Sequence, residues 1–329
     1  MLAALAVCAP FLARAQPAQQ KVVTVGVLSS SPPPAPGSAP GPLLPALNAL
    51  GYAEGRNLRV ESRYADGKPE RLPALAAELV RLPADVIVAI ASGAFAARRA
   101  TRNIPIVMLG VINPAEAGLV TSLARPGANI TGVALDAGIE VLGKRIELLK
   151  ATLPGLRRVG LMTVPQRSSA EPGLRPVREG WLKELQSVER ALGLSVRPID
   201  LTSDRRRWDQ VFRAAAAERL GAAVIIGGPY GMAHRAQLAA TALAHRLPTL
   251  YDIAGHVEAG GMMAYGADLA DTYRIAAGYV DRILKGARPA DLPVELPKKY
   301  LLTINLKTAR ALGITVPQSV LLRADRVIE

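Results

Sequence analysis

Hydrophobic residues along this chain fall into short continuous runs separated by amphipathic stretches. Residues 84–114 give the clearest example, with an apolar run over 85–90, a helical pattern over 94–101 and a second apolar run over 106–109. A short apolar run rich in β-branched residues is typical of a parallel strand buried on both faces. The same order recurs over residues 222–251, and a proline again precedes the second run. Two such units predict two similar α/β lobes.

The rest of the chain continues this alternation. Further predicted strands cover residues 21–28, 58–64, 130–135, 158–164 and 195–199. Predicted helices cover residues 45–50, 71–82, 116–123, 139–153, 181–192, 208–220, 233–245, 268–285 and 307–312. Strands that alternate with helices predict doubly wound parallel sheets. We expect the strand over 130–135 to lead the chain from the first lobe into the second.

Length and composition agree with two α/β domains. The chain has 329 residues, of which 50% are hydrophobic and only 4% aromatic, so the two cores must be mainly aliphatic. The net charge is +13, but the longest basic run is Arg205-Arg206-Arg207. Nucleic-acid binding usually shows a basic patch with a reading motif, and none is visible. We therefore expect no nucleic-acid partner.

The first twenty residues resemble an export signal. An apolar segment over Leu2–Leu12 is too short to span a bilayer, and Ala13-Arg14-Ala15 matches a small-x-small cleavage pattern. We predict cleavage after Ala15 and a periplasmic mature protein that does not span the membrane. The alternative is a buried N-terminal helix. Since the sole cysteine, Cys8, lies inside this segment, the mature chain has no disulfide.

Long ordered motifs resemble one protein family. They cover residues 71–101, 104–133, 143–162, 258–297 and 304–329. These segments closely resemble the ABC-transporter substrate-binding proteins of the tryptophan/tyrosine-binding type, and the resemblance covers nearly all of the mature chain. It implies the type I periplasmic-binding-protein fold, in which two α/β lobes are joined by a hinge and hold a small ligand in the cleft between them. It also implies an ABC permease as partner, and we expect a monomer.

The resemblance and the element order together predict the lobe boundaries. We expect an N-terminal lobe of residues 21–134 and 253–288, because the resemblance implies that residues 253–285 return to the first lobe. We expect a C-terminal lobe of residues 135–252 and 289–312, including a strand near Tyr300. The signal occupies residues 1–15, and residues 313–329 are expected to form a C-terminal tail.

Ligands of open parallel sheets bind beyond the carboxyl ends of the strands, where helices begin. The candidate ligand-binding residues at these ends are Ser29, Ser30, Ser92, Gly93, Ala94, Asn113, Pro114, Asp136, Pro229, Tyr230, Tyr251 and Asp252. The helix start at Ser92–Ala94 offers backbone N–H groups to a carboxylate. Asp136, Asn113 or Asp252 offer acceptors to an ammonium group. Tyr230 and Tyr251 suit an aromatic or apolar side chain.

Each candidate also has a purely structural interpretation. The serines are common helix caps, Asp136 and Asp252 are ordinary N-caps or solvated groups, Tyr251 is a reasonable core residue, and Asn113-Pro114 is a common turn. The sequence alone leaves these alternatives open.

Enzyme motifs are missing from the sequence. Ser92 lacks the first glycine of a nucleophile elbow, no dinucleotide-binding or P-loop pattern follows a strand, and the three histidines lack metal-ligand spacing. We therefore expect no catalytic residue, no metal site and no cofactor. The function predicted is extracytoplasmic binding of a small molecule, with amino acids as candidates, for an ABC importer. The alternatives are a ligand-sensing domain that feeds a receptor or regulator, and an α/β enzyme that uses the cleft.

Overall fold

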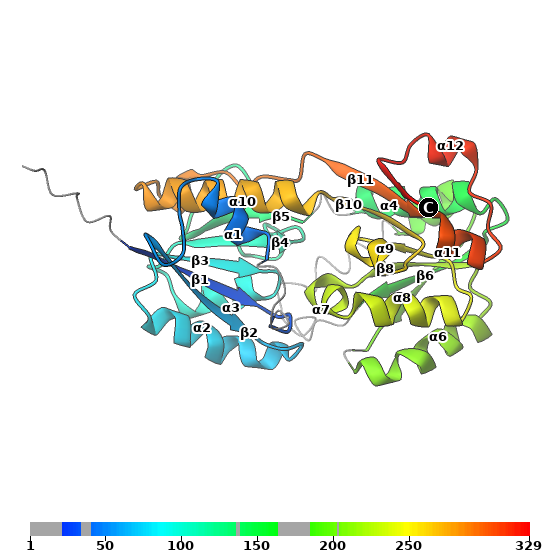
Figure 1. Cartoon of the computed structure of the whole chain (residues 1–329), viewed down its shortest axis with the longest axis horizontal. Coiled ribbons are helices and arrows are strands. Elements are labelled where there is room, and N and C mark those ends of the chain that lie inside the picture. The colour runs from blue at the N-terminus through cyan, green and yellow to red at the C-terminus, as the bar shows by residue number, and fades with distance from the viewer. Residues whose placement is uncertain (1–21, 34–40, 136–138, 164–184, 203) are drawn as a thin grey trace, which may run out of the picture.

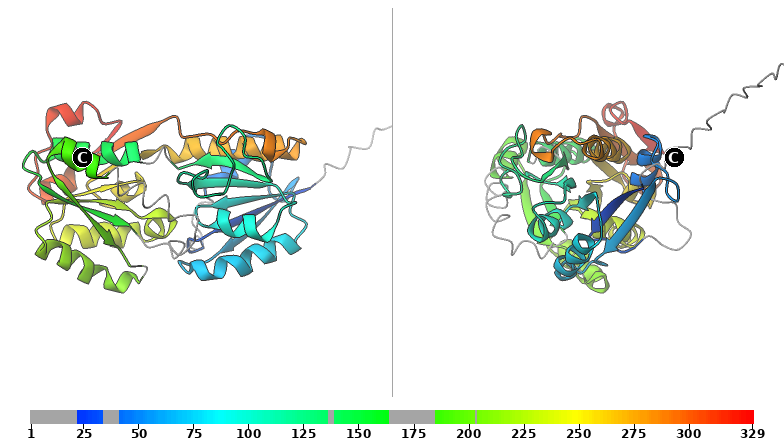
Figure 2. Two further views of the ribbon diagram at one scale, coloured as in Figure 1. Left: turned by 180° about the vertical axis from the view of Figure 1, so that it is seen from behind. Right: turned by 90° about the vertical axis from the view of Figure 1, so that its left-hand side faces the viewer.

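The computed structural model describes residues 22–33, 41–135, 139–163, 185–202 and 204–329. Two lobes, each with its own sheet, lie side by side (Figures 1 and 2). Strand order is β2-β1-β3-β4-β5 in the first sheet and β12-β11-β10-β9-β8-β6-β7 in the second. The predicted class, two α/β lobes built on parallel sheets, is confirmed.

The first lobe is a parallel five-stranded sheet covered by helices on both faces. Its strands are β1 (Val23–Ser29), β2 (Leu58–Tyr64), β3 (Val86–Ile90), β4 (Ile106–Val111) and β5 (Ile130–Ala134). Its helices are α1 (Leu43–Asn48), α2 (Leu72–Arg81), α3 (Gly93–Ala100) and α10 (Leu269–Leu284). Side chains of α2 and α3 pack on one face of the sheet, and those of α1 and α10 pack on the other.

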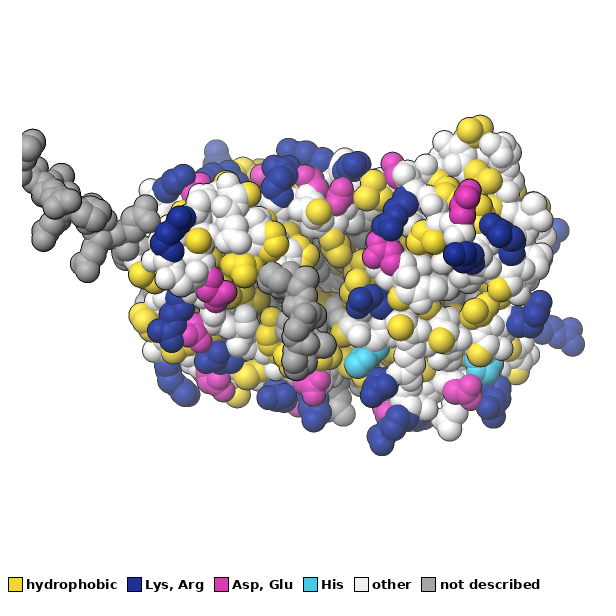
Figure 3. All heavy atoms as spheres, in the orientation of Figure 1, with side chains coloured by type: hydrophobic (Ala, Val, Ile, Leu, Met, Phe, Trp, Pro, Cys, Tyr) yellow, Lys and Arg dark blue, Asp and Glu magenta, His cyan; other side chains and the backbone are white. Residues whose placement is uncertain are grey.

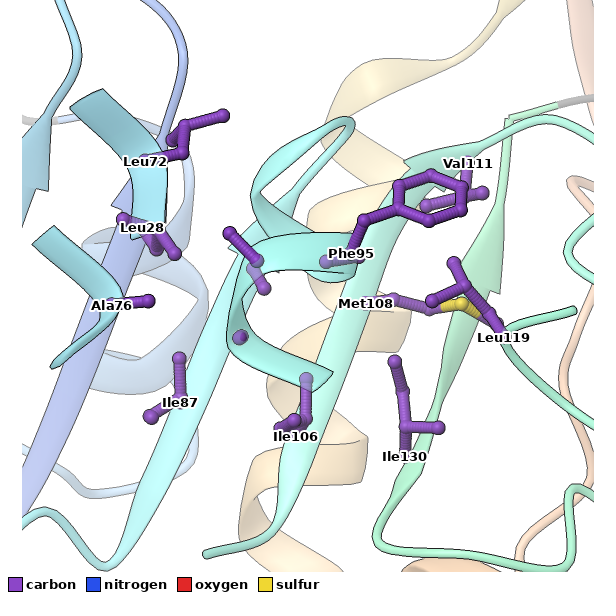
Figure 4. Packing of buried hydrophobic residues seen from close by; sticks show 14 of the residues in the cluster. Leu28, Leu72, Ala76, Ile87, Phe95, Ile106, Met108, Val111, Leu119 and Ile130 are labelled. Carbon is purple, nitrogen blue, oxygen red and sulfur yellow. The ribbon is translucent and has the colours of Figure 1, made fainter. Parts of the chain in front are cut away.

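The buried face under α2 and α3 shows why the apolar runs become strands. Ile87, Ile106 and Met108 alternate with residues that reach the opposite core, so each strand buries both of its faces (Figure 4). Phe95 of α3 packs over Met108 and Val111. This packing fixes α3, and with it the turn at Ser92, at the carboxyl end of β3.

The second lobe has a mixed seven-stranded sheet. Its strands are β6 (Arg158–Thr163), β7 (Ser195–Asp200), β8 (Ala222–Ile226), β9 (Thr249–Tyr251), β10 (Met263–Ala267), β11 (Tyr300–Asn305) and β12 (Arg326–Ile328). Its helices are α4 (Ile139–Thr152), α6 (Trp208–Ala217), α7 (Gly228–Ala233), α8 (Arg235–Ala244), α9 (Gly255–Glu258), α11 (Leu306–Ala311) and α12 (Gln318–Leu321), with a further helix over residues 185–192. Strand β11 runs antiparallel to β10, whereas the other pairs are parallel.

Strand pairing moves one predicted lobe boundary. We expected residues 253–288 in the first lobe, but β10 pairs with both β9 and β11 and belongs to the second sheet. The chain returns to the first lobe later than expected, between β10 and α10. It crosses back after Glu295, whose N–H donates to Gly132 O of β5 at 3.0 Å, so residues 289–295 still lie against the first lobe.

The C-terminal segment is part of the fold rather than a tail. Strand β12 pairs with β11, and two hydrogen bonds between Asp325 and Leu302 stabilise this pairing. The Asp325 N–H donates to Leu302 O at 2.9 Å, and its carboxylate accepts from the Leu302 N–H at 2.8 Å. The expected tail over 313–329 was wrong because these hydrogen bonds between distant segments have no local sequence pattern.

Candidate functional site

The carboxyl ends of β1, β3 and β4 in the first lobe and of β8 and β9 in the second point toward the region between the lobes (Figure 1). The space-filling view shows the surface hollowed there (Figure 3). Most of the predicted site residues are therefore brought to one region, because both sheets turn the same kind of edge toward it. Asp136 lies outside the described residues, and its role stays a prediction.

The serines after β1 hold a neighbouring turn. Ser29 is 1% exposed, and its hydroxyl lies 2.8 Å from the Ser31 hydroxyl. The Ala65 N–H donates to Ser29 O at 2.9 Å, and the Gly67 N–H donates to Ser30 O at 2.8 Å. Ser29 and Ser30 thus fix the turn that follows β2, at the edge of the hollow.

Ser92 has a buried hydroxyl with no hydrogen-bond partner among the described residues. It directly precedes α3 but makes no side-chain cap, so the structural interpretation as a helix cap is wrong. A Cβ atom on Gly93 would lie 2.7 Å from Leu28 O, which explains why glycine is needed beside β1. The Ala94 N–H donates to Ala91 O at 3.0 Å, so this N–H is not free for a ligand.

Asn113 and Pro114 form a turn after β4. Asn113 has a φ of +42°, a left-handed conformation that asparagine tolerates better than most residues. Its carbonyl accepts from the Ala117 N–H at 3.0 Å, and Pro114 O accepts from the Leu119 N–H at 2.9 Å. The turn explains both residues, and their contact with a ligand stays a prediction.

Tyr230, next to Pro229 in α7, lies at the centre of an aromatic group. Its ring meets Trp208 edge-on at 6.3 Å and His234 at 4.7 Å between centroids. Burial raises the pKa of Tyr230 and lowers the pKa of His234. The other side of the Tyr230 ring faces Gly67 of the first lobe.

Tyr251 and Asp252 end β9 and are both buried. The Tyr251 ring is fully buried and stacks on His256 at 4.6 Å and 7°, so it is a core residue, as the structural interpretation expected. Burial raises the pKa of Tyr251. Asp252 is 3% exposed, and neither carboxylate oxygen has a hydrogen-bond partner among the described residues. A buried carboxylate without a partner is costly and is typical of a functional position.

Two further features of the structure were not predicted. The Asp66–Gly67 turn after β2 reaches the second lobe, and its Asp-Gly pair is a recognisable turn signal. Arg145 of α4 is 2% exposed, and its Nε donates to Tyr265 O at 2.9 Å. The sequence feature that could have revealed Arg145 is its position on the apolar face of a predicted helix, between Leu142 and Leu149.

Within the described part of the chain, helices long and apolar enough to cross a membrane are absent. The same residues contain no group of three His, Cys, Asp or Glu side chains that is placed to hold a metal ion.

Comparison with known proteins identifies the family. The model of the ABC transporter substrate binding protein family matches residues 33–328, so the chain belongs to this family. A curated relative, the tyrosine-binding protein of Clostridioides difficile (strain R20291), is 25% identical over 271 residues, which are 82% of this chain and 74% of the relative.

Solved structures show the same fold. A conserved domain protein from Vibrio cholerae is 29% identical and has a TM-score of 0.81, with 93% of this chain and 100% of that chain covered. The ABC domain from Streptococcus pneumoniae in complex with L-Trp is 24% identical and has a TM-score of 0.76, with 92% and 100% covered. The fold is that of type I periplasmic binding proteins.

Proposed function

We propose that this protein is the extracytoplasmic solute-binding component of an ABC importer and that it binds an amino acid between its two lobes. Family membership supports the transport role. The names of two relatives, a tyrosine-binding protein and a complex with L-Trp, support an amino acid, with aromatic ones first among candidates. The predicted signal segment supports export to the periplasm, where such a component meets its permease.

The observation that carries the proposal is the unpartnered carboxylate of Asp252. It follows β9, at the sheet edge where ligands of this architecture bind, and it is buried with no hydrogen-bond partner among the described residues. Such a group destabilises the protein unless something compensates its charge. The ammonium group of an amino acid supplies both a positive charge and hydrogen-bond donors.

Ser92 complements this acceptor on the opposite lobe. Its buried hydroxyl is free to donate to a ligand carboxylate, and it lies at the start of α3, where the helix dipole favours negative charge. An amino acid would then bridge the lobes, with its carboxylate toward Ser92 and its ammonium group toward Asp252 or Asp136. Family membership favours this binding role over the alternative enzyme and sensor roles, which no feature of the site specifically supports.

The test begins with a thermal-shift screen of the amino acids, followed by calorimetry on the best ligand. The variant Asp252→Asn keeps the shape and removes the charge. Because a charged hydrogen bond contributes about 1.5–3 kcal/mol, we expect affinity to fall about tenfold or more. The unliganded variant should also melt about 2 °C or more above the wild type, since an unpaired buried charge has been removed.

Lower affinity together with a higher melting temperature distinguishes a loss of ligand binding from general destabilisation. Asp291→Asn is the matched control, because this carboxylate is 56% exposed and pairs with Arg288, three residues earlier. It should change neither affinity nor melting temperature. If both Asp252→Asn and Asp136→Ala bind the cognate ligand as tightly as the wild type does, the amino-acid pose is wrong.

A further inference from the structure

Gly67 of the first lobe and Tyr230 of the second are in direct contact. A Cβ atom on Gly67 would lie 2.2 Å from Cε2 and 2.4 Å from Cδ2 of the Tyr230 ring. No side chain larger than hydrogen fits there unless the ring moves. In Figure 1, α7 lies beside the carboxyl ends of β1 and β2, where this contact forms.

Backbone hydrogen bonds hold Gly67 in place on the first lobe. Besides the Gly67 N–H bond to Ser30 O, the Asp66 N–H donates to Ser31 O at 3.1 Å and the Lys68 N–H donates to Ala65 O at 3.0 Å. Gly67 has a φ of +68°, which glycine adopts without strain. The turn is therefore a fixed surface and not a loose loop.

Tyr230 is equally fixed on the second lobe. Trp208, which packs edge-on against it, is fully buried, and its indole N–H donates to Thr202 O at 2.8 Å. His234 packs against the same ring. The Tyr230 ring cannot withdraw from Gly67 without disturbing this group.

Charges across the contact are complementary. Besides burial, the Arg205 guanidinium of the second lobe lowers the pKa of both Tyr230 and His234, and the Asp66 carboxylate of the first lobe raises both. Asp204 of the second lobe also raises the pKa of Tyr230. An acid of one lobe and a base of the other thus face the same pair of rings. This favours approach of the two lobes at this point.

We propose that Gly67 and Tyr230 form the closure contact, which is the contact between the two lobes that stabilises the closed, ligand-bound form. Tyr230 then raises ligand affinity through this contact. The inference rests on the proposed function. Tyr230 is then a positioning residue: the ligand-binding form is the one in which its ring packs against Gly67. Any group at Gly67 that pushes the ring away lowers the fraction of closed protein, and the apparent affinity falls by the same factor.

The experiment compares Gly67→Ala with Gly118→Ala. Gly118 also lies in the first lobe and has a φ of +72°, but nothing lies within 4 Å of the position of its Cβ. Both variants carry the same backbone strain, and only Gly67→Ala meets Tyr230. We expect Gly67→Ala to weaken ligand binding about tenfold or more, mainly through faster dissociation, whereas Gly118→Ala binds like the wild type.

Tyr230→Ala and the double variant complete a mutant cycle. If the two residues act through one contact, Gly67→Ala has little further effect on affinity once Tyr230 is alanine. Fully additive effects would mean that Tyr230 touches the ligand independently of Gly67, and would overturn the proposal.

Small-angle scattering gives a second readout. At a ligand concentration that is just sufficient to saturate Gly118→Ala, Gly67→Ala should have a larger radius of gyration, and equal radii would also overturn the closure contact. A wild-type protein that binds no amino acid in the screen would instead count against the proposed function, so the two failures are distinguishable.

Discussion

At the residue scale, unpartnered polar groups gather around the end of β9. Besides the Asp252 carboxylate, the hydroxyl of Tyr251 lies beside Thr249 and Nε2 of His256 lies beside Gly231, and neither has a hydrogen bond of good geometry within the described residues. Buried polar groups without partners cost stability, so one cluster of three is unusual. The proposed function accounts for this cluster, because a bound ligand would supply partners to these groups.

His256 makes this cluster sensitive to pH. Burial lowers its pKa, although the neighbouring Asp252 carboxylate opposes the shift. The unfolded chain, with a pKa near 6.5, therefore binds the proton more readily than the folded protein. Stability should be complete above pH about 6.5 and should fall as the pH decreases toward the folded-state pKa of His256.

The variant His256→Phe tests this sign, because it keeps a ring against Tyr251 and removes the titrating group. Urea unfolding at several values between pH 7.5 and 5.5 should show a shallower loss of stability for the variant than for the wild type. His234, whose pKa burial also lowers, remains in both proteins and cancels in the comparison. Parallel pH profiles would contradict the role given to His256.

At the element scale, the sequence predicted central strands such as β3 and β8 because each buries two apolar faces, whereas β10 and β12 were not predicted. The unit over 84–114 became β3, α3 and β4 as expected. Residues 116–123, predicted as a helix, instead form turns, since Gly118 takes a φ of +72°. The helix pattern there reflected Leu119 and Val120, which pack into the first-lobe core from a turn.

Site residues were predictable only where they follow a strand. Ser92 and Asp252 were proposed in this way, because the carboxyl ends of strands are recognisable in the sequence, and their contact with a ligand stays a prediction. Tyr230 was proposed because its ring suits an aromatic or apolar ligand side chain. Its contact with Gly67 depends on how the two lobes meet, which no local sequence pattern predicts. Whether Ser92 caps a helix or stays free also depends on tertiary packing.

Gly93 tests how closely α3 must approach β1. Gly93→Ala places a methyl group 2.7 Å from the backbone oxygen of Leu28, and neither partner moves cheaply. We expect a loss of about 1–3 kcal/mol in the free energy of unfolding. The control is Gly278→Ala in α10, where nothing lies within 4 Å of the Cβ position and alanine should stabilise by about 0.5–1 kcal/mol. Equal effects in chemical denaturation would refute the close approach.

At the scale of the whole molecule, two of the crossings between the lobes lie close together. The chain passes from β10 into α10 and returns before β11, and the two passages are tied where the Asp268 N–H donates to Lys299 O at 3.1 Å. Nearby, Tyr265 of β10 stacks on Tyr300 of β11 at 5.8 Å. The predicted boundary between residues 252 and 253 placed this crossing too early, because residues 251–254 lie within the second lobe. The crossing lies instead in the β10–α10 connection, at Ala267–Asp268.

This arrangement predicts a hinge motion on ligand binding. With two crossings side by side and the Gly67–Tyr230 contact between the lobes, rotation about these two crossings would open or close the hollow while both cores stay intact. Binding sites of this kind bury about 70–90% of a small ligand, which requires the closed form. Scattering from the wild-type protein should therefore show a smaller radius of gyration at saturating ligand than without it. Profiles that superimpose at saturation would show that the lobes do not close, and the ligand would then have to enter and leave a site of fixed shape.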